Sequence, residues 1–299
     1  MIFRLSTFIY KHLTQSFAMK NKPVPFNFAI LAAAIGGFAF HAQAAVYSSS
    51  FDAAPYTFGA SLDGLDGWSV SGVTQVRTPA VAEIGSSFVL PGGTSGISGG
   101  QSINFGFQEI DAASAYLSRT VGASLVGNGA GYTEFQAAFA VNDSTPTYSN
   151  RDIFQFAFRG SAGENILTIQ LQPTSQAANP SLDNRVDQFS WSSDFAIGGS
   201  NIGTLNEGTA TTLNLTFTPS GVSDVAFSAT SAGVPLVSAV LVGAATQNLD
   251  NFGFVWIPLD PTNEGANYLN IDDVSLVPEP SSALLACVAG LGLLIRRRR

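Results

Sequence analysis

Carboxylates are the groups best suited to chemistry in the central part of this 299-residue chain. Between residues 45 and 276 the sequence has no histidine, cysteine, lysine or methionine. A Ser-His-Asp or Cys-His catalytic set needs an imidazole base, and zinc sites are built mostly from cysteine and histidine. These sites are therefore excluded there, as are disulfides and lysine Schiff bases. Carboxylates, hydroxyls, amides, tyrosines and five arginines remain.

Three aspartates form a candidate calcium site. Along Tyr268–Leu276 the alternating apolar residues change phase at Asp272 and Asp273. A β-bulge at these two residues would restore one apolar face and turn both carboxylates toward one place. With Asp52 nearby, the three carboxylates would supply the hard oxygen ligands that Ca²⁺ takes. The alternative is a solvated acidic turn.

A second group of carboxylates lies at Glu109 and Asp111. The segment Glu109-Ile-Asp-Ala-Ala-Ser114 resembles two thirds of the Glu-x-Asp-x-x-Glu strand motif of concanavalin A-like glycosidases. Glycoside hydrolysis uses one carboxyl group as acid and a second as nucleophile or base. Ser114 stands where the third acid of the motif would be. The pattern therefore favours a solvated loop or strand over a catalytic site.

The tryptophans are candidate platforms for sugar rings, because flat aromatic faces stack on them. Three are present, at Trp68, Trp191 and Trp256. A position in the core is the alternative for each. Trp256 shares the apolar phase of its strand, so we expect it in the core.

The central region is strongly acidic, which limits its partners. Twenty aspartates and glutamates, from Asp52 to Asp273, stand against five arginines, for a net charge near −15. Such a surface repels phosphate, so we expect no nucleic-acid partner. The charge suits a secreted protein that must stay soluble, or one that binds calcium.

The apolar residues of the central region recur with a period of two. The alternation runs through residues 135–141, 154–158, 167–171, 213–217, 225–229 and 252–256. This period, with phenylalanine and threonine in favoured positions, is typical of half-buried antiparallel strands. Turn-forming residues separate the runs, and no long amphipathic helix is indicated. The sequence predicts an all-β fold, an antiparallel β-sandwich or jelly roll, over residues 45–276.

The two ends of this region are similar to the first and last strands of carbohydrate-binding jelly rolls. The segments are Phe51-Asp52 with Leu65–Gly72, and Tyr268–Leu276. Both galactose-binding-like and concanavalin A-like families share the pattern, and the length favours the larger concanavalin A-like sandwich. The resemblance implies that the two ends pair at a sheet edge. It also implies a polysaccharide-associated module that carries a calcium site.

Residues 1–44 have the features of a secretory signal. A cationic part precedes the apolar run Phe26–Phe40, and a small-x-small cleavage site follows. The cleavage-site residues are Ala42, Ala44 and Ala45. Counted from Met1 the signal is longer than usual, whereas from Met19 it has about 26 residues, so we expect translation to start at Met19. The alternative is a single N-terminal membrane anchor.

The last 23 residues, 277–299, have three parts. A stiff, non-helical Val-Pro-Glu-Pro segment comes first, because each proline restricts itself and its predecessor. Ala283–Ile295 is uncharged and as a helix would rise about 20 Å, short of the roughly 30 Å of a hydrocarbon core. An arginine cluster ends the chain and would stay cytoplasmic. The sequence predicts a short transmembrane helix.

This three-part tail resembles the PEP-CTERM sorting domain of exported proteins in Gram-negative bacteria. The motif residues are Val277, Pro278, Glu279, Pro280, Arg296, Arg297, Arg298 and Arg299. The resemblance implies recognition by an exosortase, a membrane-embedded processing enzyme, after the export machinery has delivered the chain to the inner membrane. It further implies loss of the tail and release to the cell surface or extracellular polysaccharide matrix. A permanent C-terminal anchor is the alternative.

Together these features predict an exported, non-enzymatic β-sandwich that associates with extracellular polysaccharide, with calcium as the one candidate cofactor. Two alternatives stay open from the sequence. One is a glycan-active enzyme that works through carboxylates alone. The other is a purely structural matrix protein without a specific ligand.

Overall fold

The computed structural model describes residues 47–72, 82–86, 97, 101–106, 114–125, 133–142, 152–174, 186–259 and 268–278. The predictions for the signal sequence, for Glu109 and Asp111, and for the tail beyond Pro278 lie outside these residues. Within the described ranges, no helix has the length and apolar character needed to cross a membrane.

The described residues form fifteen strands and one short 3₁₀ turn. The strands are β1 Tyr47–Ser49, β2 Trp68–Ser71, β3 Ala82–Ser86, β4 Gln101–Gly106, β5 Ala115–Ser124, β6 Thr133–Asn142, β7 Ile153–Gly160, β8 Asn165–Pro173, β9 Val186–Ser192, β10 Gly199–Asn206, β11 Thr211–Ser220, β12 Asp224–Ser231, β13 Val234–Leu241, β14 Asn248–Ile257 and β15 Tyr268–Pro278, and the turn η4 is Ala244–Thr246. The predicted all-β class is confirmed.

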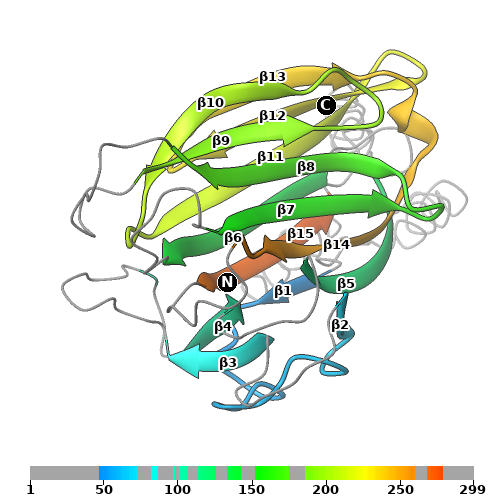
Figure 1. Ribbon diagram of the computed structural model, residues 1–299. Helices are drawn as coiled ribbons and strands as arrows, with labels where there is room; N and C mark the ends of the chain where they lie inside the picture. Colours follow the sequence, from blue (N-terminus) through cyan, green and yellow to red (C-terminus); the bar gives the residue numbers. More distant parts are fainter. Residues whose placement is uncertain are drawn as a thin grey trace, which may run out of the picture. The chain divides into compact units, whose positions relative to one another are not determined.

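The strands make two antiparallel sheets (Figure 1). The eight-stranded sheet has the order β13-β12-β11-β6-β15-β4-β3, with β1 also paired to β15. The seven-stranded sheet has the order β10-β9-β8-β7-β14-β5-β2. Neighbouring strands are antiparallel at every pairing among the described residues, as the sequence periodicity predicts.

Phenylalanine side chains pack between the facing sides of the two sheets. Phe139 of β6 meets Phe156 of β7 with ring centroids 4.9 Å apart, and Phe135 of β6 meets Phe158 of β7 at 5.0 Å. Such edge-to-face pairs add to the stability given by their buried area. The apolar phases predicted from the sequence are the buried ones in β6, β7, β8, β11, β12 and β14. The protein is therefore an antiparallel β-sandwich.

The two ends of the fold pair with each other, as the resemblance implied. β1 runs antiparallel to β15, with Tyr47 opposite Leu276 and Ser49 opposite Val274. However, β15 lies inside its sheet, with β6 on one side and β4 and β1 on the other. Among the described residues β1 pairs with β15 alone, so the two ends of the fold meet at an edge of this part of the sheet, as the resemblance implied.

Candidate functional site

The bulge predicted in the last strand is present. Along β15 the pairing with β6 shifts between Asp272 and Ser275, and Asp273 has φ +46°, in the left-handed region. The extra residue brings Ile271 and Val274, one on each side of the bulge, into the core, where both are fully buried. The change of apolar phase in the sequence therefore reflects a real irregularity of the strand.

The bulge lies where β15 exchanges one partner strand for another. β15 pairs with β4 up to Ile271, and β1 takes over from Val274. Asp52 follows β1 and accepts a hydrogen bond from the backbone N–H of Gln101, the first residue of β4, at 2.9 Å. The sequence-predicted aspartates 52, 272 and 273 thus meet at a junction of three strands, which we call the strand junction.

Asp272 is the unusual member of this group. The residue is fully buried, and its Oδ1 accepts the backbone N–H of Asp273 at 2.8 Å. Its Oδ2 is buried without a hydrogen-bond partner among the described residues. Burial is the main cause that raises the pKa of Asp272 to about 7, with smaller raising effects from the charges of Asp273 and Asp52 and a lowering effect from the Asp273 N–H. The carboxylate is therefore costly to ionise without a cation.

The carboxylates at the strand junction do not by themselves form a complete metal-binding site. Among the described residues, no group of three or more His, Cys, Asp or Glu side chains is arranged so as to hold a metal ion. Calcium also accepts backbone carbonyl oxygens and water. The buried, unpartnered Oδ2 of Asp272 fits one ligand of such an ion, and the remaining ligands would come from those sources.

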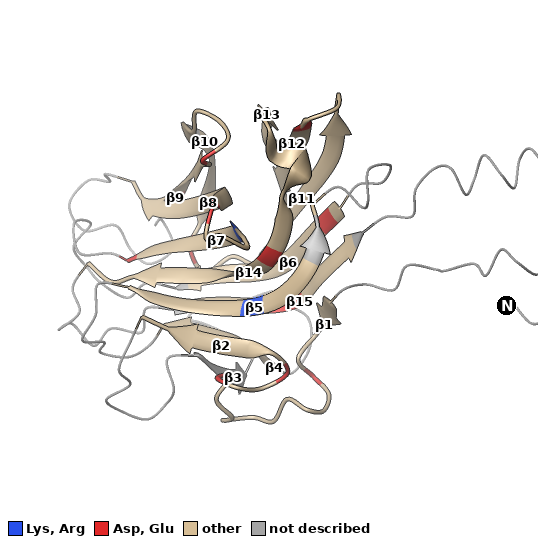
Figure 2. Cartoon of the chain, turned by 90° about the vertical axis from the view of Figure 1, so that its right-hand side faces the viewer, with Lys and Arg blue, Asp and Glu red and all other residues tan. Residues whose placement is uncertain are grey.

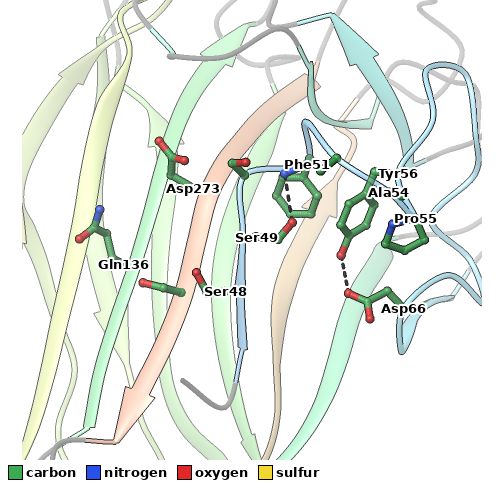
Figure 3. A pocket seen from close by; sticks show the side chains of 12 residues that line it. Ser48, Ser49, Phe51, Ala54, Pro55, Tyr56, Asp66, Gln136 and Asp273 are labelled. Atoms are coloured by element: carbon green, nitrogen blue, oxygen red, sulfur yellow. Dashed lines mark hydrogen bonds between the residues drawn. The ribbon is translucent and has the colours of Figure 1, made fainter. Parts of the chain in front are cut away.

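A pocket of about 630 Å³ opens beside the strand junction (Figure 3). It is lined by Ser48, Ser49, Ser50, Phe51, Ala53, Ala54, Pro55, Tyr56, Asp66, Gln136, Asp273 and Ser275. Figure 3 shows Asp273 and Gln136 on one side of the pocket, and Tyr56 with Asp66 on the other. The volume lies within the range of small-ligand pockets, roughly 300–1,000 Å³.

A chain of polar contacts holds one wall of this pocket. The indole Nε1 of Trp68 donates to the Tyr47 hydroxyl at 3.2 Å, which lies 2.9 Å from the Tyr56 hydroxyl. Tyr56 donates to Asp66 at 2.5 Å, and Arg119 lies 3.3 Å from the same carboxylate. Burial is the main cause that raises the pKa of both tyrosines, so both stay protonated as donors. The network fixes the segment after β1 against both sheets.

The outer face of the seven-stranded sheet is the second candidate site. Two adjacent rows of paired residues cross β5, β14, β7, β8 and β9 on that face. The first row is Tyr116, Val255, Gln155, Gln170 and Ser190, and the second is Ser118, Gly253, Ala157, Thr168 and Ser192. No member of these rows is charged, although the domain is strongly acidic. Figure 2 shows that charged residues are sparse along the strands.

Tyr116 supplies an aromatic ring on this face. A Cβ at the neighbouring Gly253 would lie 2.9 Å from the Tyr116 Cε2 and 2.1 Å from the Leu117 carbonyl oxygen, so only glycine lets the ring lie there. The Tyr116 hydroxyl donates to Asn251 Oδ1 at 2.6 Å. Burial raises the pKa of Tyr116 to about 12, against the lowering effect of Arg159, so the hydroxyl is neutral at physiological pH. The ring is held in place and remains partly exposed.

Amide side chains continue from Tyr116 across the sheet. Gln155 Nε2 donates to Gln170 Oε1 at 2.7 Å, and Gln170 Nε2 donates to Gln172 Oε1 at 2.8 Å. Each amide carries two N–H donors and an oxygen with two lone pairs, so each keeps capacity for a ligand after these bonds are made. We call Tyr116, Gln155, Gln170 and Gln172 the amide face.

The remaining sequence-predicted residues have these positions. Trp68, Trp191 and Trp256 are all buried, which confirms the core position expected for Trp256 and removes the three as exposed sugar platforms. Val277 and Pro278 form the end of β15. Outside the described residues lie Ala42, Ala44, Ala45, Glu109, Asp111, Glu279, Pro280, Arg296, Arg297, Arg298 and Arg299. Tyr116 was missed, although its place between Ala115 and Leu117, which alternate with it, would have put its side chain on the opposite face.

Comparison with known proteins gives no family. No family model matches the chain, and no curated protein matches it. Solved structures with a similar fold include the glycoside hydrolase family 131 catalytic domain from Coprinopsis cinerea, with a TM-score of 0.47 and 14% identity, covering 79% of this chain and 95% of that one. The metal-free Emp46p carbohydrate recognition domain has a TM-score of 0.45 and 10% identity, covering 77% and 95%. Alginate lyase from Pseudomonas aeruginosa has 0.44 and 9%, covering 68% and 88%. Likeness at this level does not decide the activity of this chain.

Proposed function

We propose that the β-sandwich is an exported, non-catalytic module that binds extracellular polysaccharide through the amide face. The observation that carries this proposal is the uncharged row in which Tyr116 and then Val255 are followed by the hydrogen-bonded amides of Gln155 and Gln170. Sugar hydroxyls both donate and accept hydrogen bonds, and amide groups offer both from one side chain. An aromatic ring lying on the sheet offers an apolar surface to the C–H groups of a sugar ring.

The negative charge of the protein favours a neutral polysaccharide over an anionic one as the ligand. The domain carries a net charge near −15, so an anionic polymer would be repelled on approach. The two central rows of the face hold no charged side chain, and the nearest charged group is Arg159, which lies beside the Tyr116 hydroxyl in the next row. Recognition then rests on hydroxyl hydrogen bonding and ring stacking.

The route to the matrix is the second part of the proposal. The N-terminal signal directs the chain to the export machinery, and the tail holds it in the inner membrane until an exosortase-type enzyme removes the tail. β15 ends at Pro278, where the Val-Pro-Glu-Pro motif is half complete. Cleavage beyond Pro278 would leave its pairing with Thr133 of β6 intact, so processing needs no unfolding.

Calcium is the proposed cofactor, bound at the strand junction. The buried Oδ2 of Asp272 would gain a partner, and the charges of Asp52 and Asp273 would be compensated. An ion there would tie β1 and β4 to β15, so its role is to stabilise the fold rather than to act on the ligand.

Binding of the secreted protein to neutral and anionic glycans on an array tests this function. We expect neutral glycans to be bound, and Tyr116→Ala and Gln170→Ala each to weaken binding about tenfold or more. Asn214→Ala is the matched control, because Asn214 is a half-exposed amide on β11 of the other sheet. Equal binding by all three variants would contradict the proposal. Release of reducing ends from a bound glycan would show an enzyme instead.

A further inference from the structure

Exposed aliphatic side chains gather at one end of the sandwich. Ile197 is 95% exposed, Val222 is fully exposed, Val242 is 66% exposed and Val240 is 42% exposed. They lie in or beside three neighbouring turns, β9–β10, β11–β12 and the one after β13. Aliphatic residues at the tips of turns contribute nothing to the core, and four of them lie at this one end.

The strand register places this patch at the end where β15 finishes. Pro278 pairs with Thr133, Thr133 with Phe217, Phe217 with Phe227 and Phe227 with Ala239. Beyond this row, β11 continues to the turn that holds Val222 and β13 continues to Val242. The chain leaves the fold at the same end.

Hydrogen bonds from backbone N–H groups hold the three turns together. Val242 N–H donates to the Phe195 carbonyl oxygen at 2.9 Å, and Ala245 N–H donates to the Ser223 carbonyl oxygen at 2.9 Å. Gly243 N–H donates to Asp224 Oδ1 at 2.9 Å. The patch of Ile197, Val222, Val240 and Val242 is therefore a defined surface, which we call the aliphatic end.

The short link between Pro278 and the apolar stretch of the tail indicates that a membrane would lie next to this surface. Four residues separate Pro278 from Ala283, the first residue of the apolar stretch that the tail would place in a membrane. Five Cα–Cα steps span at most about 17 Å when fully extended. The polar layer on each side of a bilayer is about 5–8 Å thick. A tail in the membrane therefore brings the aliphatic end to the bilayer surface.

We propose that the aliphatic end is a membrane-contact surface whose side chains enter the interface of the bilayer while the tail is anchored. The proposal rests on the anchored tail of the proposed function. Three acidic residues lie at the same end, and each accepts a backbone N–H; they are Glu164, Asp194 and Asp224. Their charge favours zwitterionic over anionic lipids. The contact would orient the Val-Pro-Glu-Pro segment for a membrane-embedded processing enzyme.

Environment-sensitive labels in the full chain test this contact. In a Cys287→Ser background, a fluorophore is attached at Val222→Cys, and the matched control carries it at Val234→Cys in the β12–β13 turn at the opposite end, where Val234 is 63% exposed. Both are reconstituted into phosphatidylcholine vesicles, and flotation with the vesicles reports whether the tail is anchored. We expect the Val222 label to shift to the blue and to lose about tenfold in quenching by aqueous iodide, with the Val234 label unchanged.

The other outcomes overturn the inference in distinguishable ways. Flotation with the Val222 label still quenched shows an anchored tail without the contact, which leaves the proposed export route standing. Failure to float removes both the anchored tail and the contact. Protection of the Val222 label without lipid, rising with protein concentration, shows that a second copy covers the surface. The triple variant Ile197→Ser, Val222→Ser, Val242→Ser should float unchanged but lose protection of a label at Val240→Cys.

Discussion

Replacing Asp272 with asparagine should change how stability depends on pH. In the folded protein the pKa of Asp272 is raised to about 7 from an ordinary value of 3.8, mainly by burial. The folded state therefore keeps this proton over a range in which the unfolded chain has lost it. Between about pH 4 and pH 7, each rise in pH favours unfolding, and above pH 7 the full cost is present. The amide of Asp272→Asn does not titrate.

The size of the effect follows from the two pKa values. The shift is about three pH units, and each unit corresponds to about 1.4 kcal/mol, so ionising Asp272 costs the fold about 4 kcal/mol at pH 8. The Asp272 side chain has no exposed surface but lies close to the surface of the protein, so about 4 kcal/mol is the upper limit of this cost. Against a typical domain stability of 5–15 kcal/mol this is a large fraction.

Urea unfolding in a chelator between pH 4.5 and 8, followed by the fluorescence of the buried tryptophans, measures this difference. Relative to Asp272→Asn, the wild-type free energy of unfolding should fall by about 3–4 kcal/mol across this range. Comparing the two proteins removes the contributions of all other titrating groups. Parallel profiles would refute the reasoning, because they would mean that the Asp272 carboxyl titrates alike in the folded and unfolded states.

Three further predictions concern the cation, the amide face and the core. Calcium at about 100 times its dissociation constant should stabilise the wild type by about 2.7 kcal/mol in thermal unfolding, with no shift for Asp272→Asn; an equal shift in both would exclude the strand junction. Gly253→Ala should cost about 1–3 kcal/mol in denaturant unfolding, because its Cβ would meet the Leu117 carbonyl oxygen at 2.1 Å; unchanged stability would contradict the close packing under Tyr116. Phe156→Ala should cost about 3–5 kcal/mol by the same assay, and a cost under 1 kcal/mol would refute the cross-sheet contact.

Much of the fold was predictable because the strands alternate cleanly. In β7, Phe154, Phe156 and Phe158 face the core as their period of two requires. The bulge at Asp272 was also visible, since an inserted residue moves the later apolar positions to the other phase. These features depend on neighbours in the sequence, so the sequence records them.

The sheet order and the amide face depend on long-range pairing, which leaves no local trace. β5 shows this, because Tyr116 faces outward while Arg119 lies opposite Trp68 and Phe252 with its guanidinium over the Tyr47 ring. The period of two in Ala115–Ser124 puts Tyr116 on the outer face and Arg119 in the phase of the core, but it does not show which rings receive the Arg119 guanidinium. The interior position of β15 depends on long-range pairing in the same way. β4 and β1 pair with one side of β15 and β6 pairs with the other, and the residues of β15 do not indicate these partners.

Mapping the bound sugar by NMR tests the central claim most directly. The secreted protein, labelled with ¹⁵N, is titrated with a neutral oligosaccharide selected from the array. The side-chain NH₂ signals of Gln155 and Gln170 and the backbone amides around Tyr116 should move and saturate together, while β11 and β12 stay unchanged. Saturating shifts confined to the eight-stranded sheet, with the Gln155 and Gln170 signals unmoved, would contradict the account.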